Sequence, residues 1–273
     1  MSETVFLNGK FIAAEKAMLP VLSPGFSCGI GIFETMRWHK NKTVYLDAHL
    51  RRMSGSSRFC GIKFPYGTKK VKRYVKETVA LNDLADVAVR ITVWKSPRGA
   101  GLLIAAKKYN PHPSVKYRNG FLVTVSQYRQ NEDSFLCRIK SINRLAYELG
   151  FFQAKSKGFD EAIILNSRGY VAEATRSNIF IVNNGKIFTP GLASGCLPGI
   201  TRRVVFDLAR TCGIRICETN LTTKDIKEAQ EAFLTNSLMG IMPLTRLDKY
   251  IIGKGRCARI TKSLILKYSS LLK

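Results

Sequence analysis

The strongest constraint on the fold is a run of short apolar segments between residues 161 and 190, EAIILNSRGYVAEATRSNIFIVNNGKIFTP. Turn-forming residues interrupt the run at 167–169 and 183–185, so it predicts three or four strands in succession. Residues 86–94, DVAVRITVW, alternate in polarity, as a half-buried strand does. Because helical patterns separate the strands elsewhere, the sequence predicts a mixed α/β (α+β) fold.

A hairpin, several helices and two further strands complete the predicted pattern. Residues 5–12 are expected to form the hairpin, because Asn8-Gly9 tolerates the positive φ angles of a type I′ turn. Two prolines and little apolar material at 109–120 predict a linker between a first domain at 1–115 and a second at 121–273. The expected helices cover 47–61, 68–82, 143–157, 200–212, 223–229 and the chain from about 256, and the two strands cover 121–128 and 231–236.

The net charge of +25 on 273 residues is also typical of proteins that bind nucleic acids. Its densest part is the segment 69–76, in which Val71 and Val75 keep a helical spacing and basic residues fill all but one of the other positions. This pattern predicts one solvated helix face. No RNA-recognition, KH or helix-turn-helix signature accompanies the charge, so no specific nucleic-acid partner is expected.

The seven cysteines are odd in number and scattered, without the spacing of a zinc site. We interpret them as reduced thiols, mostly buried, and expect no metal. The first residues lack a basic leader, and no apolar run is long enough to cross a bilayer. The sequence therefore predicts a cytoplasmic protein without a membrane partner.

The segment LPGITRRVVFDLARTCG suggests an anion site. Pro198-Gly199 turns the chain into a helix, and the backbone N–H groups of Ile200 and Thr201 then lie at the positive end of the helix dipole. The Thr201 hydroxyl is a further donor. The alternative is an ordinary helix start with a threonine near the cap.

Two further segments carry one reactive candidate each. Lys140 stands before a predicted helix, flanked by Ile139 and Ile142, and an amine in apolar surroundings is available for imine formation. Glu173 shares a strand face with Val171, and a half-buried carboxylate needs a cationic partner. The alternatives are a surface lysine and a structural ion pair.

In this order the three segments resemble the fold-type IV, or class IV aminotransferase, family of pyridoxal 5′-phosphate (PLP) enzymes. The family includes branched-chain aminotransferases, D-amino acid aminotransferases and 4-amino-4-deoxychorismate lyases. The resemblance covers nearly the whole chain and implies an N-terminal α/β domain and a C-terminal domain built around a pseudo-barrel, with PLP between them, in a homodimer. The matching stretches are FLNGKFI, LSPGFSCGIGIFETMR, HLRRM, IKSINRL, DEAIILNSRGYVAEATRSNIFIV, LPGITRR and EAFLTNSLMGIMP.

The resemblance also implies roles for single residues. Lys140 is similar to the family's Schiff-base lysine and catalytic acid and base, and Glu173 to the carboxylate that keeps the pyridine nitrogen protonated. In the HLRRM stretch, His49 and Arg52 match an H-x-x-R pattern whose arginine binds the cofactor phosphate. The other phosphate ligands implied are Ile200, Thr201 and Ser237.

The reaction is the least constrained part of the interpretation. The segment FETMR at 33–37, followed by IKSINRL, resembles the lyases, which convert 4-amino-4-deoxychorismate to 4-aminobenzoate and pyruvate for folate biosynthesis. The lyase is therefore the expected activity. The alternative is an aminotransferase for branched-chain, aromatic or D-amino acids. Phe33, Arg37 and Arg90 are candidates to bind a small anionic substrate, although either arginine could be structural.

Overall fold

The computed structural model describes residues 3–40 and 42–272. Its chain contacts divide it into two compact units. The first consists of Met1–Asn110 and Ile139–Asn143, and the second of Pro111–Arg138 and Arg144–Lys273. The short segment that carries Lys140 therefore clusters with the first unit, although it lies in the second half of the chain.

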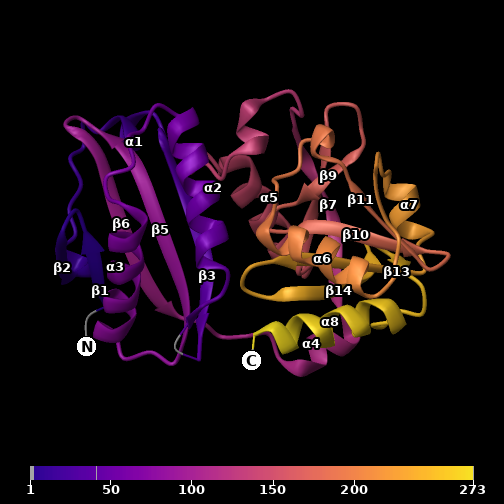
Figure 1. The fold of residues 1–273 in the computed structure, drawn as a ribbon. Coiled ribbons are helices and arrows are strands. Elements are labelled where there is room, and N and C mark those ends of the chain that lie inside the picture. The colour runs from indigo at the N-terminus through magenta and orange to yellow at the C-terminus, as the bar shows by residue number, and fades with distance from the viewer. Residues whose placement is uncertain (1–2, 41, 273) are drawn as a thin grey trace. The chain divides into compact units, whose positions relative to one another are not determined.

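The helices and strands of both units are labelled in Figure 1 where space allows. The strands are β1 (Thr4–Leu7), β2 (Lys10–Ala13), β3 (Gly31–His39), β4 (Lys42–Thr43), β5 (Asp86–Ser96), β6 (Gly99–Lys108), β7 (Phe121–Gln130), β8 (Glu161–Asn166), β9 (Val171–Ala174), β10 (Asn178–Asn183), β11 (Lys186–Pro190), β12 (Ile216–Thr219), β13 (Glu231–Asn236), β14 (Gly240–Leu247) and β15 (Tyr250–Ile251). The α-helices are α1 (Pro24–Ser27), α2 (Leu46–Phe59), α3 (Thr68–Leu81), α4 (Ser114–Asn119), α5 (Leu145–Ser156), α6 (Ile200–Thr211), α7 (Thr223–Lys227) and α8 (Arg259–Leu271). Three 3₁₀ turns add η1 (Ala14–Lys16), η2 (Phe135–Arg138) and η3 (Leu192–Ser194).

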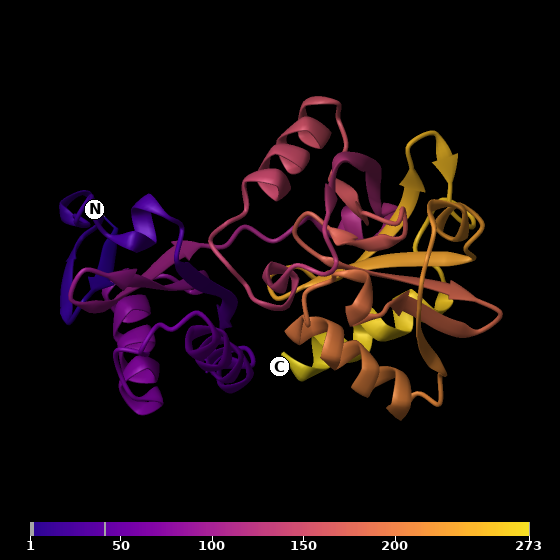
Figure 2. The same ribbon diagram turned by 90° about the horizontal axis from the view of Figure 1, so that it is seen from above.

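The first unit is a six-stranded antiparallel sheet in the order β2-β1-β6-β5-β3-β4. The predicted hairpin joins β1 to β2, and Asn8 and Gly9 have φ angles of 49° and 103°, as a type I′ turn requires. Helices α2 and α3 lie on the same side of the sheet (Figure 2). Val71 and Val75 of α3 join the buried core, which explains their spacing in the basic segment.

The second unit contains a nine-stranded mixed sheet. Its path runs β12-β11-β10-β13-β14-β7-β8-β9, and β15 pairs with β14. The last strand of this path, β9, contacts β10 and β11, which stand near the first strand of the path. The sheet therefore curls towards a barrel. Helix α5 packs on β7 and β8, and α6 packs on β12, β13 and α8. The α/β class predicted from the sequence is confirmed.

The predicted linker at 109–120 differs from the structure. These residues contain α4, which packs on β14. The Tyr117 hydroxyl donates to the Met239 carbonyl over 2.8 Å, and the Thr245 hydroxyl donates to the Asn119 carbonyl over 2.6 Å. The segment therefore belongs to the second unit, whose boundary falls between Asn110 and Pro111.

The part of the chain that the structure describes contains no candidate membrane span and no candidate metal cluster. None of its helices combines the length and the apolar character that a membrane span needs. Within residues 3–40 and 42–272, no three His, Cys, Asp or Glu side chains gather as a metal site would require.

Candidate active site

The backbone around Lys140 is held against β3 by an isolated antiparallel bridge between Ile32 and Ser141. The Phe33 N–H donates to the Lys140 carbonyl over 2.8 Å, and the Ile142 N–H donates to the Gly31 carbonyl over 3.0 Å. These two hydrogen bonds join segments that are more than 100 residues apart in the chain. They fix the position of the Cα atom of Lys140, from which the flexible side chain extends.

The Lys140 side chain lies against an aromatic ring. Its Nζ atom is 4.7 Å from the centre of the buried Phe33 ring. The Arg90 guanidinium lies over the same ring at 3.7 Å. Two of the three candidate substrate residues, Phe33 and Arg90, are thus brought to the lysine.

Arg52 belongs to a buried charge cluster on α2 and β3. Its Nε and Nη2 atoms donate to the two oxygens of Glu34, each over 2.7 Å, and His49 Nδ1 lies 2.6 Å from Glu34 Oε2. Burial alone would raise the pKa of Glu34, but the hydrogen bonds from His49 and Arg52 lower it to about 2. The pKa of His49 is lowered by burial and, to a lesser extent, by the Arg52 and Lys140 charges, although Glu34 opposes this.

Arg37 has a structural partner in the first unit. It donates to both oxygens of Asp86, at 2.9 and 2.5 Å, and its guanidinium lies 5.0 Å from the centre of the Tyr109 ring. Hydrogen bonding to Arg37 lowers the pKa of Asp86. A bidentate pair of this kind is what the structural alternative for Arg37 predicts.

Glu173 is buried in β9 and accepts hydrogen bonds from three groups of the second unit. The Tyr147 hydroxyl donates to its Oε1 atom over 3.1 Å. The Leu197 N–H and Asn178 Nδ2 donate to Oε2 over 3.1 and 3.3 Å. The whole of β9 is buried, not only the face that carries Val171 and Glu173.

The start of α6 is tied to Glu173 by Asn178. The Asn178 amide also donates to the Leu197 carbonyl over 2.9 Å, one residue before the Pro198-Gly199 turn. Gly199 is the N-cap residue of α6, and Thr201 is buried in its first turn. The second unit therefore places the predicted carboxylate and the predicted anion-binding helix terminus in one neighbourhood.

Gly199 leaves no room for a side chain. A Cβ atom added there would lie 2.0 Å from Asn178 Oδ1, so Gly199→Ala should displace the Asn178 amide and destabilise the protein by about 1–3 kcal/mol. Gly191 is the matched control, since its Cβ would meet only the Glu218 Cβ at 3.8 Å and its φ is −67°. Urea unfolding of both variants tests this, and equal stability of the two would contradict it.

Ser237 lies in the turn between β13 and β14. The Asn236 side chain shapes this turn by accepting from the backbone N–H groups of Leu238 and Met239, over 3.0 and 2.9 Å. Asn236 Nδ2 also donates to the Arg176 carbonyl over 3.2 Å, three residues after Glu173. The Ser237 turn is thus linked to the chain that follows Glu173.

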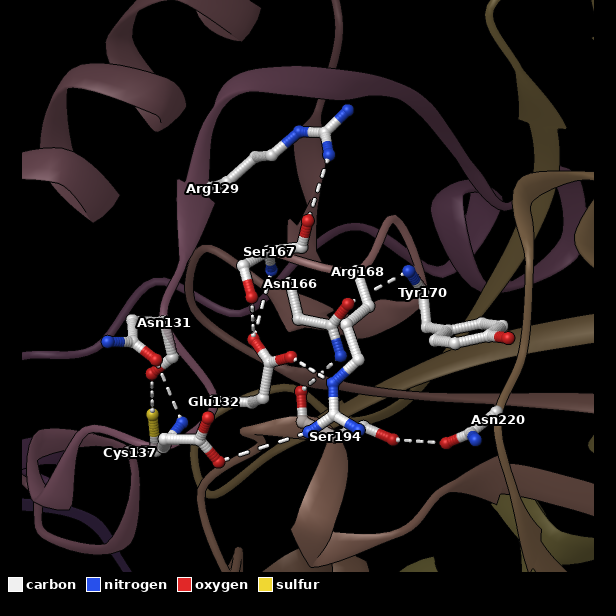
Figure 3. A network of polar contacts seen from close by, with 11 residues as sticks. Arg129, Asn131, Glu132, Cys137, Asn166, Ser167, Arg168, Tyr170, Ser194 and Asn220 are labelled. Carbon is white, nitrogen blue, oxygen red and sulfur yellow. Dashed lines mark hydrogen bonds and ion pairs between the residues drawn. The ribbon is translucent and has the colours of Figure 1, made fainter.

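A polar network around Glu132 anchors the segment that leads to Lys140 (Figure 3). The buried Glu132 carboxylate accepts from the N–H and hydroxyl of Ser167 over 3.0 and 2.7 Å, and from Arg168 Nε over 2.6 Å. Hydrogen bonds from the Ser167 hydroxyl, from backbone N–H groups and from Arg168 lower the pKa of Glu132 to about 2. In the same segment the Cys137 thiol donates to the Asn131 carbonyl over 3.1 Å. These contacts fasten the segment to the turn between β8 and β9.

Sequence reasoning missed Glu34, Tyr147 and Asn178 as parts of the site. Glu34 had a detectable signal, since a carboxylate inside an apolar strand requires hydrogen-bonding partners. Asn178, a polar residue at the start of the apolar strand NIFIV, had a weaker signal of the same kind. Nothing in the sequence distinguished Tyr147.

The chain belongs to the class IV aminotransferases, whose family model matches residues 31–247. A provisionally named branched-chain-amino-acid aminotransferase of Methanocaldococcus jannaschii is 33% identical over 98% of this chain and 96% of that protein. The D-alanine aminotransferase of Bacillus licheniformis is 28% identical, with 95% and 93% covered. The solved branched-chain aminotransferase of Thermoproteus uzoniensis with norvaline matches at a TM-score of 0.91 and 30% identity, covering 100% of this chain and 95% of that one.

These comparisons define a PLP-dependent enzyme. A further solved neighbour, the Thermobaculum terrenum branched-chain aminotransferase in its PLP form, matches at a TM-score of 0.88 and 25% identity over 99% of this chain and 94% of that one. The donors present here fit PLP, since the chain offers a lysine amine for an aldehyde, a carboxylate for a protonated ring nitrogen, and a helix terminus for a phosphate.

The expectation of a 4-amino-4-deoxychorismate lyase is wrong. The named relatives and solved neighbours are branched-chain or D-amino acid aminotransferases. The lyase interpretation depended on FETMR and IKSINRL, and the structure shows what three of those residues do. Glu34 binds Arg52, Arg37 binds Asp86, and Asn143 Nδ2 donates to the Gly29 carbonyl over 2.8 Å. Such scaffold contacts do not discriminate between a lyase and an aminotransferase.

Proposed function

We propose that this enzyme transfers the amino group of branched-chain L-amino acids to a 2-oxo acid. The observation that carries the proposal is the grouping of Lys140, Phe33 and Arg90 in the first unit. This grouping places an amine and a guanidinium against the same apolar ring. An apolar ring suits an aliphatic side chain, and a guanidinium suits a carboxylate. The relative with 33% identity and the solved neighbour with norvaline support the same substrate class.

The proposal assigns the cofactor contacts as follows. Lys140 holds PLP through its amine, and Glu173 pairs with the pyridine nitrogen. Arg52, oriented by Glu34, serves the phosphate together with Ile200 and Thr201 at the α6 terminus. Ser237 adds a hydroxyl to the same group.

PLP, when bound, supplies an electron sink that stabilises negative charge at the amino acid α carbon. The side chains of the enzyme move the proton, orient the substrate and exclude water. As a free amine, Lys140 Nζ would accept the α proton of the amino acid and hold it for transfer. Arg90 orients the substrate carboxylate, and Phe33 keeps water from the amine with its buried ring.

A substrate comparison tests the proposal. The PLP-loaded protein is incubated with 2-oxoglutarate and either L-leucine, L-isoleucine and L-valine or D-alanine, and glutamate formation is followed. We expect kcat/KM for the L-amino acids to exceed that for D-alanine by about tenfold or more. The D-alanine aminotransferase relative makes the reverse preference the specific alternative. A preference for D-alanine, or no transfer with any donor, would contradict the proposal.

The proposal includes a homodimer, which the family resemblance implies, and a cytoplasmic location, which the sequence predicts. Light scattering of the purified PLP-loaded protein measures the oligomeric state. A mass near twice 30.6 kDa supports the dimer, and a mass near 30.6 kDa refutes it.

A further inference from the structure

Tyr147 lies in the first turn of α5, seven residues after Lys140 in the chain, and reaches the carboxylate of Glu173. The Tyr147 hydroxyl donates to Oε1, whereas the Asn178 amide and the Leu197 N–H donate to Oε2. The three donors therefore divide between the two oxygens. This division fixes the plane of the carboxyl group as well as its position.

The phenol can act towards Glu173 only as a donor when the carboxylate is ionised, because an ionised carboxyl group has no proton to give. Burial and the neighbouring Glu173 charge raise the pKa of Tyr147 well above its ordinary value. The hydroxyl consequently stays protonated throughout the working range. A hydrogen bond from a neutral donor to a charged acceptor is stronger than one between neutral groups.

The Tyr147 ring is itself held in place. The Arg144 guanidinium lies 4.6 Å from its centre. Arg144 also donates to the Thr175 carbonyl and lies 3.4 Å from Glu148. Since Thr175 follows Glu173 by two residues, the same part of the chain positions the donor and its acceptor. The hydroxyl therefore does not have to be ordered when the cofactor binds.

We propose that Tyr147 is a positioning residue for PLP, which holds the Glu173 carboxylate ionised and oriented towards the pyridine nitrogen. The inference rests on the role of Glu173 under the proposed function. It assigns to α5 a part in tuning the cofactor, in addition to following the lysine in the chain. A purely structural Tyr147 would support folding alone.

The test is Tyr147→Phe, which keeps the ring and removes the hydroxyl. The PLP dissociation constant of the apoprotein, measured by equilibrium dialysis, should rise about tenfold. In the loaded enzyme kcat should fall by a similar factor while KM for the amino acid stays constant, because the hydroxyl acts through Glu173 and not on the substrate. An unchanged dissociation constant and kcat, with or without a loss of apoprotein stability, would overturn the proposal.

Tyr128→Phe is the matched control. Tyr128 lies on β7, and its hydroxyl accepts from Gln153 Nε2 of α5 over 3.2 Å. Like the Tyr147 hydroxyl, the Tyr128 hydroxyl makes a hydrogen bond that involves α5, but it accepts from a neutral amide instead of donating to a carboxylate. We expect Tyr128→Phe to leave PLP affinity and turnover at the wild-type level. A loss equal to that of Tyr147→Phe would show a general effect of α5 packing and overturn the specific role.

Glu173→Gln separates failure of this inference from failure of the proposed function. If Glu173→Gln leaves PLP affinity and turnover intact, the role of Glu173 is wrong and the inference falls with it. If Glu173→Gln impairs both and Tyr147→Phe impairs neither, the inference alone is wrong. Adding Tyr147→Phe to Glu173→Gln should cause little further loss, because the two residues act as one unit.

Discussion

Replacing Lys140 by alanine should reduce amino transfer by about 10²- to 10⁴-fold or more, since the variant loses the group proposed to move the α proton. The Phe33 and Ile142 backbone contacts that hold this segment do not involve the lysine side chain, so the fold should remain intact. The measurement is glutamate formation from 2-oxoglutarate and L-leucine under saturating PLP.

The exposed Lys108 at the end of β6 provides the control for charge loss. Lys108→Ala removes one positive charge from the first unit and should leave the rate unchanged. Turnover of Lys140→Ala at the wild-type rate would refute the assigned role.

Replacing Glu34 by glutamine should destabilise the first unit by about 3–5 kcal/mol, because Arg52 would lose the carboxylate that compensates its partly buried charge. The two tryptophans of the sequence, Trp38 and Trp94, both lie in this unit, so their fluorescence in urea reports its unfolding. The control is Glu77→Gln on α3, whose pair with Arg73 is exposed and contributes about 1 kcal/mol or less. Equal stability of the two variants would contradict the prediction.

Acid should remove the stability that Glu34 contributes to the folded state. The folded pKa of Glu34 is about 2, below its ordinary 4.5, so the unfolded state binds the proton first. The stability from Glu34 is therefore complete above pH 4.5 and is lost as the pH falls towards 2. The difference between the wild type and Glu34→Gln should shrink over this window, and a constant difference would contradict the account. Because the pKa of His49 is also lowered, the wild type should begin to lose stability below that residue's ordinary value of 6.5.

Local patterns in the sequence predicted most helices and strands. The alternation at 86–94 corresponds to β5, the valine spacing at 71–75 to α3, and the predicted helix at 223–229 to α7, which begins with a capping box of Thr222 and Asp225. These signals survive because each depends on neighbours within one or two turns of the chain. Helix α4 was missed because its six residues are too few to show a period.

The candidate site was predictable only in part, since its geometry depends on contacts between distant segments. The two prolines at 111 and 113 gave no sign that α4 packs on β14. Likewise, nothing near Arg37 indicated that Asp86, 49 residues away, would engage it. The pairing of Lys140 with β3 could not be predicted either, because no periodicity links residue 140 to residue 33. The reaction was predicted wrongly for a related reason, since Glu34, Arg37 and Asn143 of the motifs used to infer it make scaffold contacts.

Borohydride reduction of the PLP-loaded protein, followed by tryptic peptide mapping, tests the central claim most directly. Reduction would fix the cofactor on the amine that holds it, and a modified Lys140 resists trypsin. We therefore expect a phosphopyridoxyl group on the peptide IKSINR, residues 139–144. The same group on a different lysine, with residues 139–144 unmodified, would contradict the account.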